Sequence, residues 1–80
     1  METRRRQERH RTLKTGKIIF NRKTSVVDCT VRNVSDGGAC LEVDSVVGIP
    51  KAFDLVMDGI RRSCNVKWTN ANRMGVSFQQ

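Results

Sequence analysis

The stretch SVVDCTVRNVSDGGACLEV, residues 25–43, decides the fold. Apolar and polar residues alternate on both sides of a central Asp-Gly-Gly bend, and a period of two is typical of half-buried strands. The positions on the apolar face are Val27, Cys29, Val31, Ala39, Leu41 and Val43. The segment therefore predicts two antiparallel strands joined by a tight turn.

The bend Asn33–Gly38 also carries chemistry that a turn does not require. Asn33 and Ser35 have short side chains that donate and accept hydrogen bonds, while Gly37 and Gly38 permit positive φ and close approach of a ligand to backbone N–H groups. Such a turn can form a concave nest for a phosphate or a purine edge. A polar hairpin loop without a ligand is the plainer interpretation, and the segment alone favours it.

Working outward, the sequence predicts four further strands, around residues 17–21, 53–57, 63–68 and 76–78. Asp58-Gly59 is a favoured two-residue hairpin turn, whereas Gly48 and Pro50 indicate a crossing loop. Six short strands without a helical pattern predict a small all-β domain, a six-stranded antiparallel β-barrel spanning residues 17–80 with no C-terminal helix. The predicted interior is Ile18 (or Ile19, if the register slips by one), Phe20, Val27, Cys29, Val31, Ala39, Leu41, Val43, Phe53, Leu55, Met57, Cys64, Val66, Trp68, Val76 and Phe78.

Length and cysteine content narrow the possible classes. Eighty residues suffice for one domain. The sequence has no apolar run of 18 or more residues, so we expect no membrane span. The charged N-terminus is not followed by an apolar stretch, so we expect no signal peptide. Cys29, Cys40 and Cys64 lack Cys-x-x-Cys spacing, which argues against a disulfide framework and a zinc site. We therefore expect a cytoplasmic protein with reduced thiols, no bound metal and no membrane insertion.

Positive charge concentrates at the N-terminus. Residues 1–17 hold seven basic side chains against Glu2 and Glu8, a balance of +5 within a total of +7. Residues 1–16 are therefore predicted to be a basic arm, flexible in the free protein, with Leu13 the first side chain to dock. The asymmetry points to an anionic partner, although a solvated tail would give the same composition.

An enzyme is not expected. The single histidine, His10, lies among arginines, and no motif holds a nucleophile beside it. Cys40 is the one thiol on an outward position, where it is more often incidental than catalytic. Nucleic-acid binding is a better alternative because a basic arm can follow a phosphate backbone, but every aromatic ring falls on an inward position, which leaves no stacking platform. A nucleotide-independent protein-interaction module is another alternative.

A further possibility joins the arm to the bend. Arg5 and Arg9 are four residues apart, and an arm folded across the rim could aim both guanidinium groups at one ligand. Each can bind phosphate in bidentate fashion or address O6 and N7 of guanine, and each can stack on a purine face.

These residues resemble the PilZ domain, a bacterial receptor for cyclic di-GMP. Residues 5–9, RRQER, match its RxxxR motif, and residues 33–38, NVSDGG, match its (D/N)xSxxG motif. The ending MGVSF, residues 74–78, is similar to the GVxF ending common in that family. Two motifs in the right order, with a resemblance over nearly the whole chain, outweigh the plainer interpretation of the bend.

The resemblance implies a role for each matching residue. Arg5 and Arg9 would grip the dinucleotide phosphates and a guanine, with Asn33, Ser35, Gly37 and Gly38 on the barrel surface beneath. A basic residue before the first motif, here Arg4, goes in the family with an intercalated dimer of cyclic di-GMP, so two ligands per domain are expected. The arm would change conformation and be read by an unidentified effector protein, and the chain would be a monomer or a weak homodimer. The family usually adds a C-terminal helix that packs over the barrel. This sequence departs from that pattern, since only two residues follow Phe78.

Overall fold

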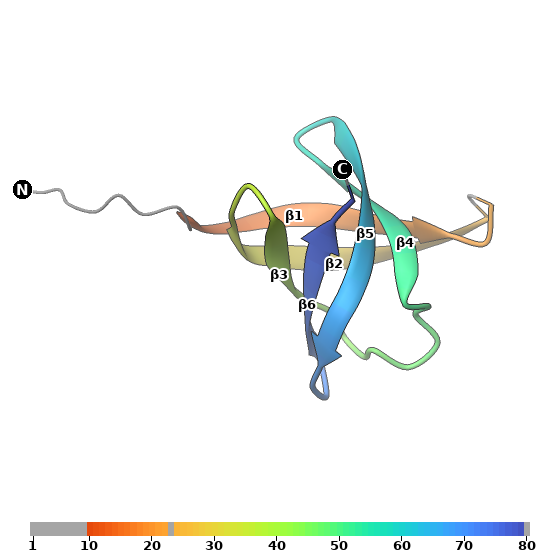
Figure 1. The fold of residues 1–80 in the computed structure, drawn as a ribbon. Coiled ribbons are helices and arrows are strands. Elements are labelled where there is room, and N and C mark those ends of the chain that lie inside the picture. Colours follow the sequence, from red (N-terminus) through yellow and green to blue (C-terminus); the bar gives the residue numbers. More distant parts are fainter. Residues whose placement is uncertain (1–9, 23, 80) are drawn as a thin grey trace, which may run out of the picture.

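The computed structural model describes residues 10–22 and 24–79 and shows a closed barrel of antiparallel strands (Figure 1). The strands follow the chain as β1 (His10–Phe20), β2 (Ser25–Val34), β3 (Gly38–Glu42), β4 (Ala52–Met57), β5 (Ile60–Thr69) and β6 (Arg73–Phe78). Their order around the barrel is β1-β2-β3-β6-β5-β4. The predicted fold class, a six-stranded antiparallel barrel, is confirmed.

Alternation along the strands places the core. Among the residues whose burial the structure describes, eleven side chains are buried: Ile18, Cys29, Val31, Leu41, Val43, Phe53, Leu55, Cys64, Met74, Val76 and Phe78. Other predicted interior residues, such as Phe20, Val27 and Met57, are partly buried against this cluster. Ile18 is fully buried and Ile19 only partly, which settles the register of β1. Among the described residues no helix is long and apolar enough to cross a membrane.

The first strand is much longer than predicted. β1 begins at His10 rather than Lys17, and its first residues pair with β2 through His10 opposite Val34 and Arg11 opposite Asn33. Residues 10–16, assigned to the arm from their charge, are therefore part of the sheet. The prediction failed because this segment has no apolar alternation: only β2 pairs with it, and pairing needs backbone groups rather than apolar side chains.

In the described part of the chain three β-bulges interrupt the pairing, and none of them can be recognised from the sequence. One lies on β1 between Arg11 and Lys14, where Leu13 has a φ of 47°. The second lies on β2 between Val31 and Asn33, and the third on β5 between Val66 and Trp68. A bulge adds one residue to one strand, so every side chain beyond it changes face.

One interior prediction is wrong because of the bulge on β5. Trp68 was expected to face inward with Cys64 and Val66, but its side chain is 48% exposed. Met74, which was not predicted as interior, is buried with 1% exposure because β6 begins earlier than predicted and continues the alternation of Val76 and Phe78. The largest aromatic ring of the protein is thereby on the surface.

Candidate functional site

The bulges on β2 and β5 turn two side chains toward the same hollow. Val31 lies opposite Leu41 in the core, but the extra residue Arg32 brings Asn33 opposite Cys40. Residues directly opposite each other in an antiparallel pair share a face, so Asn33 and Cys40 both face outward. On β5 the extra residue Lys67 likewise brings Trp68 opposite Gly75. Bulges frequently re-aim side chains beside functional sites.

The hollow lies on the outer surface of β3 and β6, beside the β2–β3 turn. Its volume is about 270 Å³. We call it the rim hollow. The residues that line it are Asn33, Ser35, Gly37, Gly38, Ala39, Cys40, Lys67, Trp68, Gly75 and Val76. The rim hollow thus contains the polar motif of the turn, one aromatic ring, one ammonium group and no carboxylate.

Trp68 stands over β6 because residue 75 has no side chain. A β-carbon placed on Gly75 would overlap Nε1 of the indole and come within 2.8 Å of Cδ1. Gly75 is buried, so one side of the ring rests on the strand while nearly half of the side chain stays exposed to solvent. An exposed, backed aromatic ring of this kind is a stacking surface for a base.

The glycines of the turn have a different role from the one predicted. Neither Gly37 nor Gly38 has a positive φ. Gly38 is needed instead for close approach, since a β-carbon there would overlap the carbonyl oxygen of Val76. Open space surrounds the corresponding position at Gly37. Absence of a side chain at residue 38 therefore lets β3 pack closely against β6.

Hydrogen bonds within the turn show which groups a ligand could use. The N–H of Ser35 donates to the carbonyl of Gly38 at 2.8 Å, so it belongs to the turn and not to a phosphate nest. The hydroxyl of Ser35 reaches the same carbonyl only at 3.4 Å, which is long for an O–H···O bond. Ser35 can thus offer its hydroxyl to a ligand, beside the half-buried amide of Asn33.

The start of β1 leads to this same rim. His10 lies opposite Val34, one residue before Ser35, and Figure 1 shows the beginning of β1 beside the β2–β3 loop. Arg4, Arg5 and Arg9 lie outside the described residues. Arg9 directly precedes His10 in the sequence, and the five residue steps from Arg5 to His10 span at most about 18 Å. The RxxxR motif therefore directly precedes the strand that begins at this rim.

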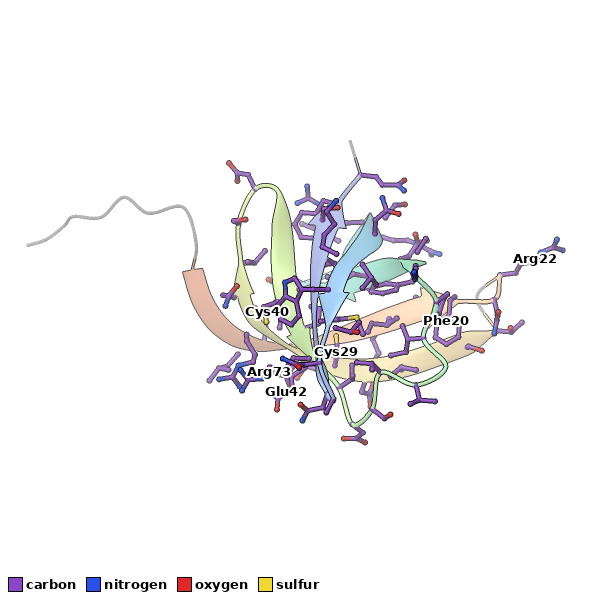
Figure 2. All side chains as sticks on the ribbon, turned by 60° about the horizontal axis from the view of Figure 1, so that its bottom comes forward. Phe20, Arg22, Cys29, Cys40, Glu42 and Arg73 are labelled. Atoms are coloured by element: carbon purple, nitrogen blue, oxygen red, sulfur yellow. The ribbon has the colours of Figure 1, made fainter. Side chains whose placement is uncertain are left out.

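Of the seven predicted site residues, the structure brings together the four that it describes: Asn33, Ser35, Gly37 and Gly38. Sequence reasoning missed Lys67 and Trp68. The only sequence signal for an outward Trp68 is Gly75, and Gly75 can be matched with Trp68 only once the bulge on β5 is known. Figure 2 shows Arg22 at the tip of the β1–β2 hairpin, away from Cys40 and the rim hollow.

The remaining thiols are part of the core. Burial raises the pKa of Cys29 and of Cys64 to about 11, which keeps both protonated at neutral pH. All three cysteines are free, and the described residues contain no cluster of three or more potential metal ligands.

Comparison with known proteins agrees with this architecture. Curated proteins give no match to the chain. The sequence model of the PilZ domain matches residues 3–80, which include both motifs, the rim hollow and all six strands. PilZ domains are generally receptors for cyclic di-GMP and are binding domains rather than enzymes. The match covers nearly the whole chain, which therefore belongs to the PilZ domain family.

Proposed function

We propose that this protein binds cyclic di-GMP in the rim hollow, with Arg5 and Arg9 closing over the nucleotide from the N-terminal side. The observation that carries this proposal is the convergence of two bulges. They bring Asn33 and Trp68 onto one outward hollow, at the point where the strand following the RxxxR motif begins.

The size of the hollow supports a site completed by the arm. Its volume of about 270 Å³ lies below the range of roughly 300–1,000 Å³ typical of pockets for drug-sized ligands. The barrel surface alone would cover only part of a cyclic dinucleotide. Arginine side chains from the adjoining arm can cover the rest and supply the bidentate contacts that phosphate and guanine need.

Each group of the rim hollow has a definite task in this proposal. Trp68 stacks on one guanine, and the amide of Asn33 and the hydroxyl of Ser35 bond to its polar edge or to ribose. Lys67, an exposed cation of the lining, offers its ammonium to a phosphate. Gly37 and Gly38 have no side chains, so the ligand can approach the barrel surface closely there. Arg4 extends the cationic edge to a second, intercalated nucleotide, which gives two ligands per domain.

The arm is also the proposed source of the signal. Nucleotide docks on the rim, the arm folds over it, and an effector protein reads the changed surface. Ordering an arm on binding costs about 2–5 kcal/mol, whereas hydrogen bonds to charged groups contribute about 1.5–3 kcal/mol each. Two arginine contacts therefore roughly offset the ordering cost. We expect a dissociation constant near the micromolar scale, equivalent to roughly 8 kcal/mol.

Calorimetric titration with cyclic di-GMP tests the proposal, because it gives affinity and stoichiometry together. Arg9→Ala should weaken binding about tenfold or more, since it removes a charge-assisted contact. Arg22→Ala is the matched control: this arginine lies at the opposite end of the β1–β2 hairpin and should leave binding unchanged. Absence of heat with wild-type protein near millimolar nucleotide would refute the proposal.

Amide hydrogen exchange tests the arm as the moving part. Residues 4–12 should gain protection when cyclic di-GMP is added, because the arm then folds over the ligand and becomes ordered against it. Equal protection with and without nucleotide would show that binding does not act through the arm.

Single-stranded nucleic acid is a second candidate, and the exposure of Trp68 favours it. The sequence-based argument against this function was the absence of a stacking platform, and that argument no longer holds. Titration with random DNA and RNA oligonucleotides at increasing salt separates the two functions. For a cyclic di-GMP receptor we expect weak binding with a steep salt dependence, whereas tight binding to oligonucleotides would reverse the ranking.

A further inference from the structure

A second hollow lies on the other side of Trp68, between the β3–β4 loop and β5. Its volume is about 370 Å³. Apolar side chains of Val46, Ile49, Val66 and Met74 line it, with Lys51 and Lys67 at its edge and Trp68 as the wall that it shares with the rim hollow. We call it the loop groove.

The loop that forms one side of the groove is fixed at both ends. The N–H of Val43 donates to the carbonyl of Asn72 at 2.8 Å, and the N–H of Val66 donates to the carbonyl of Lys51 at 2.8 Å. Between these anchors the N–H of Ile49 donates to the carbonyl of Val46. The groove is therefore a preformed surface, and binding there would cost little ordering of the loop.

The charge around the groove has one sign. The four ion pairs among the described residues use other cations: Lys14 with Asp58, Lys17 with Asp28, Arg32 with Glu42, and Arg61 with Asp54. Lys51 and Lys67 are exposed and take part in none of these pairs, and the lining contains no carboxylate. An apolar floor with two uncompensated ammonium groups is complementary to an acidic chain that carries apolar anchors.

We propose that the loop groove docks an acidic, apolar-anchored peptide segment of a partner protein. Two or three aliphatic side chains enter between Ile49 and Val66, and carboxylates of the same segment pair with Lys51 and Lys67. Docking does not depend on a nucleotide. Coupling between the two sites does rest on the proposed function: phosphate bound to Lys67 removes half of the positive charge at the groove and lowers its affinity for an acidic peptide.

Selection of displayed 12-residue peptides on the intact protein tests the docking. Selected peptides should combine Leu, Ile, Val or Phe with Asp or Glu, and in spectra of isotope-labelled protein they should shift the amide signals of residues 46–49, 51 and 66–69. Neutral or basic consensus sequences, or shifts confined to other residues, overturn the proposal.

Matched variants locate the contacts. Lys51→Glu should weaken the selected peptide about tenfold at low salt and reduce the salt dependence of binding, whereas Arg22→Glu, an equal charge change at the far hairpin, should not. Ile49→Ser should weaken it about tenfold, whereas Ile60→Ser, which changes an exposed isoleucine outside the groove, should have no effect. Equal binding by each variant and its control overturns the proposal.

Two further measurements separate the alternatives. Cyclic di-GMP at a few times its wild-type dissociation constant should weaken peptide binding several-fold in the wild type and much less in Arg9→Ala, whose site is then mostly unoccupied. If nucleotide does not bind at all, the proposed function fails while peptide docking stands. Sedimentation at increasing protein concentration tests whether a second copy of the chain occupies the groove. A dimer that Ile49→Ser dissociates would show that the groove serves self-association instead.

Discussion

The indole ring of Trp68 lies over the backbone of Gly75, in the space that a β-carbon at residue 75 would need. The two residues are opposite each other only because β5 has an extra residue between Val66 and Trp68. One glycine and one bulge together therefore convert a core position into an exposed aromatic surface.

Gly75→Ala should displace this ring. A β-carbon would overlap Nε1, so the indole must turn away from β6 and lose its backed position. We expect affinity for cyclic di-GMP to fall about tenfold, within the range of roughly 1–3 kcal/mol that one base–aromatic stack contributes. Trp68 is the single tryptophan of the chain, so intrinsic fluorescence reports on it directly. Unchanged emission and affinity in the variant would contradict the role of Trp68, and Trp68→Phe, which keeps a smaller ring, should lose less than Trp68→Ala.

The two glycines of the turn should differ in stability. Gly38→Ala forces β3 away from the backbone of Val76 and should destabilise the protein by about 1–3 kcal/mol, the usual cost of overpacking. For a domain of this size such a loss lowers the melting temperature by about 4–8 °C per kcal/mol. Gly37→Ala, with open space around its β-carbon, is the control and should change the melting temperature little. Thermal unfolding followed by circular dichroism compares the two, and similar losses would show that close approach to β6 is not the reason for Gly38.

Thiol reactivity should distinguish Cys40 from the other cysteines. Cys40 is partly exposed in the rim hollow, whereas Cys29 and Cys64 are buried and their pKa values are raised to about 11. Native protein treated with iodoacetamide at pH 8 should therefore gain one adduct, at Cys40, by mass spectrometry. Cyclic di-GMP should slow this reaction. An unchanged rate at saturating nucleotide would place the ligand elsewhere.

Alkaline pH should destabilise the core. Both buried thiols have a pKa raised from 9.0 to about 11, which means that the folded state holds their protons more tightly than the unfolded state. Their contribution to stability is complete below about pH 9 and is lost as the pH rises toward 11. Urea unfolding at intervals between pH 8 and 11 measures the loss. The double variant Cys29→Ala, Cys64→Ala should be less stable throughout but should decline less over this interval, and equal slopes would assign the decline to other groups.

Local patterns predict most of this barrel because most of its strands alternate. Residues 25–31 and 53–57 alternate without interruption, and Asp58-Gly59 adopts the predicted turn with positive φ at both residues. The start of β1 could not be predicted, because its strand character comes from backbone pairing with β2 and not from its side chains.

Only part of the candidate site could be predicted from the sequence, for a similar reason. Asn33 and Ser35 stand in a recognisable motif, but Lys67 and Trp68 reach the rim hollow only through the bulge on β5. Alternation assumes an unbroken ladder, so it assigned Trp68 to the core and removed the one stacking ring from consideration. A bulge depends on how two strands pair, so it cannot be recognised from the sequence of one strand alone.

The inserted residues on β2 and β5 give the surface an unusual sensitivity to chain length. Deleting Arg32 or Lys67 would remove the bulge but leave Asn33 or Trp68 facing outward, because each would then directly follow an inward residue, Val31 or Val66. One residue added to β6 between Gly75 and Val76 would instead pair with Lys67, and regular alternation would then turn Trp68 inward. Comparing the number of residues on β5 with the number on β6 is for that reason as informative about this face as reading their identities.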